Sequence, residues 1–240
     1  MAKAKWHLDW KVLAHEPLRK LEPDLWEVTA SVPGMPLRRR MTLVRLSDGR
    51  LVVHNAVSLE DDVMAEILAW GPLAFLVVPN HFHRLDAFAW KTRFPELQVI
   101  AGERARKKVG EAVPVAGGVE LLPADGGLSG EPIAGDKCGE MAFVKTHVDG
   151  GKTLVLNDIL FNEPHHGGFT GFVFRILGST GGPRVTRIMK LAGISDKKAT
   201  KAHLLRLAAL PGLRRIIMSH GDIIERDAAT ILTQAAESYL

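Results

Sequence analysis

Apolar residues along this chain fall into short continuous runs that alternate with turn residues and with stretches at helical spacing. In the first third, apolar and β-branched residues dominate these runs, which is typical of strands. The predicted strands span residues 25–32, 38–46 and 50–57. An Asp48-Gly49 pair lies between the last two runs, and this dipeptide predicts a hairpin turn. Ser58 and Asp61 then have the spacing of a helix capping box, so we expect a helix that ends at Trp70.

From residue 73 onward, runs of strand length alternate with segments at helical spacing. We expect strands at 73–79, 97–101 and 119–122 and helices at 84–93 and 103–109. Strands that alternate with helices indicate parallel βαβ units with right-handed crossovers. The pattern therefore predicts an α/β protein.

The second half of the chain repeats this order of strands followed by strand–helix units. Residues 123–140 are rich in Gly, Pro and Asp and predict a long loop, and residues 157–185 hold many Gly with little periodicity. The predicted elements are strands at 141–148, 152–156 and 213–218 and helices at 197–210 and 225–240. The repetition predicts two similar αβ halves, approximately 1–125 and 126–240, within a single domain.

Composition narrows the classes of function. The formal net charge is +4, and the basic clusters at 38–40 and 104–108 are not interleaved with aromatic residues, so we expect no nucleic-acid partner. No apolar run reaches the roughly 20 residues that span a bilayer, and the first ten residues lack the apolar segment of a signal peptide. The single cysteine, Cys138, excludes an internal disulfide. We therefore expect a cytoplasmic protein with a small-molecule substrate and no membrane partner, in an oligomeric state that the pattern leaves open.

The most distinctive motif is His81-Phe82-His83, which follows the apolar run at 73–79. Residues i and i+2 of an extended segment project to the same side, so both imidazoles would converge on one point. Imidazole is a good ligand for Zn and Fe, and a nearby carboxylate completes a typical set of ligands. The motif predicts either a metal site at a strand terminus or two histidines that only form hydrogen bonds in a loop.

Further polar residues lie at the ends of predicted strands or in the loops beside them. These are Asp86, Asp136, Asp158 and His220. In αβ folds the carboxyl ends of strands face a common crevice, where these groups could meet the two histidines. A plainer interpretation also fits, because Asp is common at helix N-caps and in turns.

The order of these residues resembles the ligand pattern of the metallo-β-lactamase superfamily. The shared features are an HxH motif, an acid in a loop before Gly139-Glu140, a strand-terminal Asp and a strand-terminal His-Gly. The resemblance covers nearly the whole chain in element order and is closest to a divergent branch with a Pro79-Asn80 pair before the first ligands. It implies an αββα sandwich of two mixed sheets flanked by helices, and a site for one or two divalent ions, Zn or Fe/Mn. The ligands that it implies are His81, His83, Asp86, Asp136, Asp158 and His220.

Three positions depart from the family pattern. Leu85 stands where the family has an acid that serves the second metal and often acts as a base. Asp86 stands where it has the next His, and Asp136 where it has a loop His, and carboxylates in these places favour harder metals. The resemblance implies a metal-dependent hydrolase that uses metal-activated water, with Asp86 and Asp158 as catalytic residues. The alternatives are an iron-dependent oxidoreductase of the same superfamily and a non-enzymatic protein with a decayed metal site.

Overall fold

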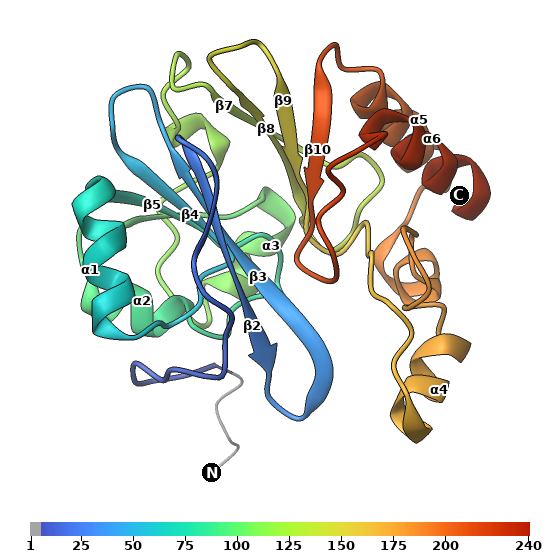
Figure 1. Cartoon of the computed structure of the whole chain (residues 1–240), viewed down its shortest axis with the longest axis horizontal. Helices are drawn as coiled ribbons and strands as arrows, with labels where there is room; N and C mark the ends of the chain where they lie inside the picture. The colour runs from blue at the N-terminus through green and yellow to red at the C-terminus, as the bar shows by residue number, and fades with distance from the viewer. Residues whose placement is uncertain (1–5) are drawn as a thin grey trace. The chain divides into compact units, whose positions relative to one another are not determined.

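The structure is a computed structural model that describes residues 6–240, apart from the side chains of Thr170 and Tyr239. It contains two mixed β-sheets flanked by helices (Figure 1), which confirms the predicted fold class. The chain divides into two compact units. Unit 1 comprises Met1–Ser31 and Arg40–Ser129, and unit 2 comprises Val32–Arg39 and Gly130–Leu240.

Unit 1 is built on a six-stranded sheet whose strands lie in sequential order. These strands are β1 (Arg19–Glu22), β2 (Leu25–Val32), β3 (Met35–Arg45), β4 (Leu51–His54), β5 (Leu73–Val77) and β6 (Gln98–Ile100). The helices are α1 (Asp61–Trp70), α2 (Ala87–Arg93) and α3 (Glu103–Val109). β3 and β4 are antiparallel, and the predicted turn joins them with Gly49 at φ +87°. β4, β5 and β6 are parallel and are connected through α1 and α2, which confirms the predicted βα units.

The core of unit 1 forms where its helices bury apolar side chains against this sheet. Val53 of β4 and Leu76 of β5 are fully buried together with Met64 and Ile67 of α1 and Trp90 of α2. Each such side chain contributes about 1.5–3 kcal/mol by its removal from water. This packing holds the carboxyl ends of β4 and β5, and the loops that follow them carry the candidate residues of this unit.

Unit 2 is built on a four-stranded mixed sheet. In spatial order its strands are β10 (Leu213–Ile217), β9 (Lys152–Val155), β8 (Met141–Thr146) and β7 (Leu128–Pro132). β9 is parallel to β10 and antiparallel to β8. The helices are α4 (Gly168–Ile176), α5 (Lys197–Ala208) and α6 (Ala228–Tyr239), and a π-helical turn covers Met189–Gly193. α5 and α6 bury Leu204, Leu207 and Leu232 in a core with Leu154 of β9 and Ile216 of β10.

The predicted capping box at Ser58 is wrong. α1 begins at Asp61 with Glu60 as its N-cap, and no side chain caps the helix. The backbone N–H of Ser58 instead donates to the carboxylate of Asp86, which holds this residue in the loop before the helix. The capping pattern fails because a partner distant in sequence takes the residue out of the helix.

Two other local predictions are wrong, and one helix was not predicted. Residues 119–122 form a 3₁₀ turn rather than a strand, because the N–H groups of Leu121 and Leu122 donate to carbonyls three residues earlier. The loop predicted at 123–140 contains the strand β7. Residues 157–185 contain α4, in which two glycines lower the helix propensity that a sequence pattern can reveal. No helix of the described residues is long and apolar enough to cross a membrane.

Candidate metal centre

His81 and His83 lie in a bend shortly after β5 ends at Val77. The buried side chain of Asn80 organises this bend, since its Oδ1 accepts the backbone N–H groups of Phe82 at 2.8 Å and of His83 at 3.2 Å. The expectation that both histidines project from one side of an extended strand is therefore wrong, because the Asn-centred turn curls the backbone there. The ring of His81 packs on the ring of Phe82, with centroids 4.0 Å apart.

His83 is oriented by Asn55, which follows β4 in the left-handed region at φ +59°. Asn55 Nδ2 donates to the carbonyl oxygen of Arg40 at 2.8 Å, so its Oδ1 faces the imidazole. That oxygen can only accept, and His83 Nδ1 at 3.1 Å therefore carries the ring proton and donates it. In the neutral ring the lone pair then lies on Nε2, which is the arrangement of a metal-binding histidine.

His54, the last residue of β4, is buried near His83. Burial, and then the charge of His83, lower the pKa of His54 to about 3. His54 is therefore neutral at physiological pH. It adds no positive charge beside His83, which favours the binding of a cation there.

Asp86 lies immediately before α2, and its side chain is fully buried. Oδ1 accepts a hydrogen bond from His7 Nδ1 at 2.6 Å, and Oδ2 accepts the backbone N–H of Ser58 at 3.2 Å. These bonds tie two distant segments to the start of α2. They favour a structural role, and the roles of Asp86 as metal ligand and catalytic base stay predictions.

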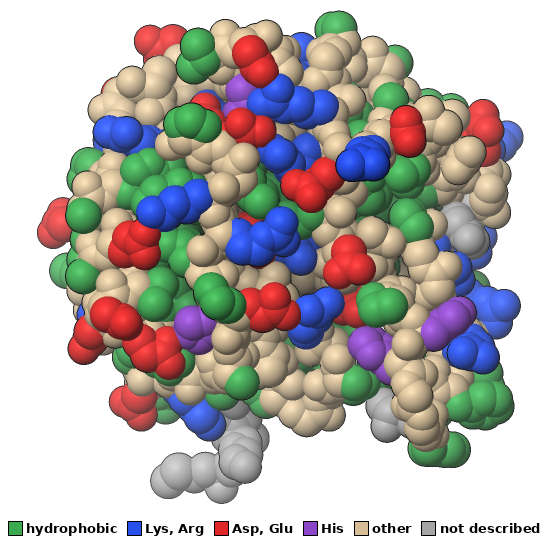
Figure 2. All heavy atoms as spheres, in the orientation of Figure 1, with side chains coloured by type: hydrophobic (Ala, Val, Ile, Leu, Met, Phe, Trp, Pro, Cys, Tyr) green, Lys and Arg blue, Asp and Glu red, His purple; other side chains and the backbone are tan. Residues whose placement is uncertain are grey.

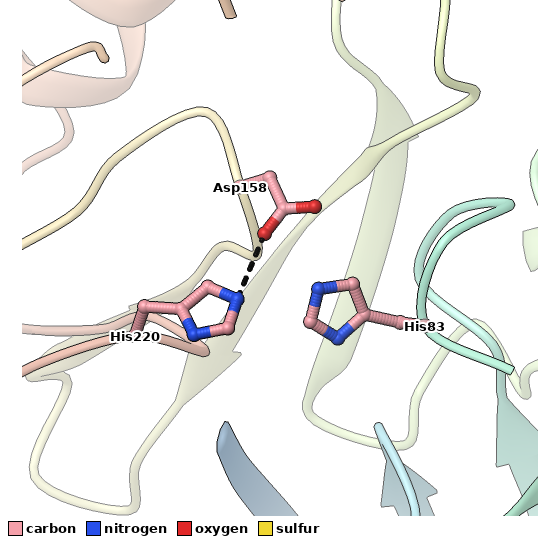
Figure 3. Close-up of side chains that lie close together, drawn as sticks. All are labelled: His83, Asp158 and His220. Carbon is pink, nitrogen blue, oxygen red and sulfur yellow. Dashed lines mark ion pairs between the residues drawn. The ribbon is translucent and has the colours of Figure 1, made fainter. Parts of the chain in front are cut away.

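Asp158 and His220 meet at one edge of the sheet of unit 2. Asp158 lies three residues beyond the end of β9, and His220 lies three residues beyond the end of β10. Because these neighbouring strands are parallel, their carboxyl ends lie at the same edge. His220 Nε2 is 3.2 Å from Asp158 Oδ1 (Figure 3), and both side chains are almost completely buried. The structure thus brings together the two strand-terminal residues that the sequence singled out in this half.

The other nitrogen of His220 is held by the backbone. Nδ1 lies 2.6 Å from the carbonyl oxygen of Arg38, which can only accept, so Nδ1 carries a proton. Burial alone would lower the pKa of His220, but the hydrogen bond and charge of Asp158 and the Arg38 carbonyl raise it above its ordinary value. In the neutral ring, Nε2 would present a lone pair to a carboxylate oxygen. Two facing acceptors need a cation between them, either a proton on Nε2 or a metal ion.

Glu140 fixes the backbone that carries Asp158. It is fully buried, and its two carboxylate oxygens accept the backbone N–H groups of Asn157 at 2.8 Å, Asp158 at 2.9 Å and Ile159 at 3.0 Å. Burial, followed by the charges of Asp158 and Asp136, raises the pKa of Glu140 well above its ordinary value. The carboxylate acts as a buried anchor for the turn after β9.

Asp136 serves the loop in which it lies. Its Oδ2 accepts the backbone N–H of Glu140 at 2.7 Å, and the N–H groups of Cys138 and Gly139 also face the carboxylate. Burial raises the pKa of Asp136, and the charge of Asp158 adds to this effect. These contacts explain why an acid stands before Gly139-Glu140, and the role of Asp136 as metal ligand stays a prediction.

The loop after Asp158 holds a further carboxylate–imidazole pair. Glu163 is fully buried, and His166 Nε2 lies 3.3 Å from its Oε2. His165 Nδ1 lies 3.0 Å from Thr180 Oγ1. The two histidines are thus engaged within unit 2.

Several residues that shape the site were not predicted from the sequence. They are Asn55, which orients His83; Asn80 and Glu140, which hold the loops of His83 and of Asp158; and the Arg38 carbonyl, which orients His220. Asn80 directly follows the predicted strand at 73–79, and Asn in such a place is a signal for an Asx turn, whereas Asn55 lies inside the predicted strand at 50–57 and gives no such signal. A backbone carbonyl far away in sequence leaves no such signal.

No protein-family model and no curated protein matches this sequence. Solved structures of metallo-β-lactamases are nevertheless similar to it over most of its length, which shows that the chain has the metallo-β-lactamase fold. The enzyme from Erythrobacter litoralis has a TM-score of 0.62 at 14% sequence identity and covers 92% of this chain and 96% of its own. DIM-1 metallo-β-lactamase has a TM-score of 0.63 at 14% identity and covers 95% and 99%. The enzyme from Hirschia baltica has a TM-score of 0.61 at 13% identity and covers 92% and 97%.

This likeness confirms the fold that the ligand pattern predicted. Identities of this size show the fold alone. They assign no activity to this chain.

Proposed function

We propose that this protein is a metal-dependent hydrolase that uses metal-activated water on a small-molecule substrate. The observation that supports it best is the orientation of the two histidines. His83 and His220 each donate Nδ1–H to a protein oxygen, of Asn55 and of Arg38, so in the neutral ring of each the lone pair lies on Nε2, where a metal ion can take the place of a proton.

The donor set fits a divalent metal. Asp158 supplies a carboxylate beside His220 Nε2, and its own backbone is anchored by Glu140. We propose His83, Asp158 and His220 as the principal ligands, with His81, Asp86 and Asp136 as additional ligands to be tested. When bound, such a metal supplies a Lewis acid and lowers the pKa of a coordinated water toward 7.

The protein residues then have to accept and orient a proton. Both oxygens of Asp86 already accept hydrogen bonds, and Leu85 replaces the usual acid of the superfamily. Asp158, the other catalytic candidate, lies beside the imidazole of His220. We therefore propose Asp158 as the first candidate for a carboxylate that would hold a proton in this site, with Asp86 as the second.

Metal content of the purified, untagged protein tests this proposal, and it is measured by plasma mass spectrometry after preparation without chelators. We expect one or two divalent ions per chain, a loss of about tenfold or more in affinity for His220→Ala and His83→Ala, and no change for His15→Ala. His15 is the matched control, because its imidazole also pairs with a carboxylate, that of Glu60. An unmodified protein that stays metal-free after reconstitution, or equal metal content in the double variant His83→Ala/His220→Ala, would overturn the proposal and favour a decayed site.

An iron-dependent oxidoreductase is the second candidate. Two imidazoles and one carboxylate form the ligand set that non-haem Fe(II) enzymes use, and the same set also suits Zn. The element found in the protein separates the two functions. Bound iron with a redox-active spectrum supports the oxidoreductase, whereas bound Zn with hydrolysis of a chromogenic ester that His220→Ala abolishes supports the hydrolase.

A further inference from the structure

Large apolar side chains are concentrated at the surface of one segment of unit 2. Of the ten large hydrophobic residues that are exposed in the described part of the chain, five belong to α4, the π-helical turn and the residue that directly precedes this turn. They are Phe169, Phe172, Ile176, Ile188 and Leu191. Phe169 is 82% exposed and Leu191 is 79% exposed, so these side chains extend into solvent rather than line a groove. We call these five residues the apolar rim.

The apolar rim is one continuous feature. Phe169, Phe172 and Ile176 have i, i+3 and i+7 spacing, which places them on one face of α4. Arg187 connects α4 to the second part of the rim, because its backbone N–H donates to the carbonyl of Leu177 at 3.3 Å and its guanidinium donates to that of Ile176 at 2.7 Å. Ile188 and Leu191 therefore lie beside the C-terminal end of α4.

The segment that carries the apolar rim is uniformly basic. Residues 164–195 contain Arg175, Arg184, Arg187 and Lys190 and no Asp or Glu. Figure 2 shows hydrophobic side chains next to Lys and Arg at the lower right, over the position that α4 has in Figure 1. A protruding helix with exposed Phe and Ile and flanking Arg is the composition of elements that lie in a membrane interface. Basic residues beside it add attraction for anionic lipid headgroups.

We propose that the apolar rim binds the surface of an anionic lipid bilayer, with its phenylalanines inserted at the headgroup level. The earlier expectation of no membrane partner rests on the lack of a spanning segment, which does not bear on surface binding. The surface protrudes and is charged with one sign, which fits a soft anionic interface better than a second copy of the same basic segment. This proposal uses residues outside the proposed metal ligands, so it stands or falls independently of the proposed function.

Vesicle sedimentation tests the proposal with the full-length protein. The vesicles are pure phosphatidylcholine or phosphatidylcholine with about a third phosphatidylglycerol, at low salt and at about 0.5 M salt. The test variant is Phe169→Ser/Phe172→Ser, and the control is Met35→Ser/Val148→Ser, which also removes two exposed apolar side chains from unit 2. A third variant, Arg175→Gln, removes one exposed positive charge of α4.

We expect binding to anionic vesicles that falls about tenfold or more for the double phenylalanine variant and is unchanged for the control. Arg175→Gln should lower it a few-fold, and high salt should weaken it for every variant. Sedimentation with neutral vesicles alone, equal binding of the two double variants, or no binding at all would overturn the proposal. A self-associating protein whose dimer, measured by light scattering, is lost in Phe169→Ser/Phe172→Ser without vesicle binding would overturn it in favour of a second copy.

Discussion

Replacing Gly221 by alanine tests whether the backbone beside His220 is held as tightly as the structure indicates. Gly221 has φ +89°, and a Cβ there would lie 2.1 Å from both the carbonyl carbon and the carbonyl oxygen of Asn162. Three hydrogen bonds hold the two segments together. The Asn162 N–H donates to the carbonyl of His220 at 3.2 Å. The N–H of Asp222 donates to the carbonyl of Asn162, and the side-chain Nδ2 of Asn162 donates to the carbonyl of Asp222. Neither backbone can therefore move away cheaply to make room for a methyl group.

A second glycine separates the backbone penalty of the substitution from the penalty of steric overlap. Gly150, in the turn between β8 and β9, has φ +81°, and a Cβ built on it meets no atom within 4 Å. Gly150→Ala should therefore cost only the left-handed backbone penalty, about 1–2 kcal/mol. Gly221→Ala carries the same penalty and adds an overpacking term of about 1–3 kcal/mol, for a total of about 2–5 kcal/mol.

Urea unfolding of the two variants at constant m-value measures this difference directly. Because the displaced segment carries His220, we also expect Gly221→Ala to lower metal affinity, whereas Gly150→Ala should leave it unchanged. Equal losses of stability in the two variants would refute the reasoning, since they would mean that the backbone at Asn162 yields freely.

Three further outcomes are expected. Burial and the nearby carboxylates of Asp136, Asp158 and Glu140 raise the pKa of Cys138 to about 12, so its thiolate fraction at pH 8 is about 10⁻⁴. Alkylation of Cys138 should therefore be rapid only after the protein is unfolded in urea, and rapid alkylation of the native protein would contradict this. The pKa of His54 is about 3 in the folded state and about 6.5 in the unfolded state, so between these pH values only the unfolded chain binds the proton. The free energy of unfolding should therefore fall by up to about 1.4 kcal/mol per pH unit on acidification through this window. The same slope in His54→Gln would contradict this prediction. Asn55→Gly keeps the left-handed backbone and removes the acceptor for His83 Nδ1, so metal affinity should fall about 10–100-fold. It also removes the buried Nδ2 donor to the Arg40 carbonyl, so stability should fall by about 1–3 kcal/mol. Unchanged metal affinity would show that the amide does not orient His83.

The sequence predicted best those elements that local pattern and buried core specify together. The apolar runs at β4, β5 and β9 are strands because their side chains are also the core, and the Asp48-Gly49 turn forms because Gly49 readily adopts positive φ. Parallel order followed from strand–helix alternation, and it places Asp158 and His220 at one sheet edge. In these cases local preference and tertiary packing favour the same structure.

The failures have three separate physical causes. Ser58 looked like a helix cap, but its N–H is bound by Asp86, and α1 starts three residues later. The HxH motif looked extended, but Asn80 folds it into a bend. α4 was not predicted because its glycines and its exposed apolar face give neither high propensity nor a buried stripe, and periodicity arguments depend on burial.

The carboxylates show why a ligand pattern needs its hydrogen bonds to be interpreted. Asp86, Asp136 and Asp158 all follow or precede strands, and the sequence treats them alike. In the structure the oxygens of Asp86 accept from His7 and Ser58, and Asp136 accepts from the backbone of its own loop. Of the three, only Asp158 combines two features. Its backbone N–H is bound by the buried carboxylate of Glu140, and its side chain faces the imidazole of His220, whose Nδ1 proton is held by the Arg38 carbonyl. A carboxylate held in this way is oriented by the fold before any metal binds, and this preorganisation favours Asp158 among the proposed ligands.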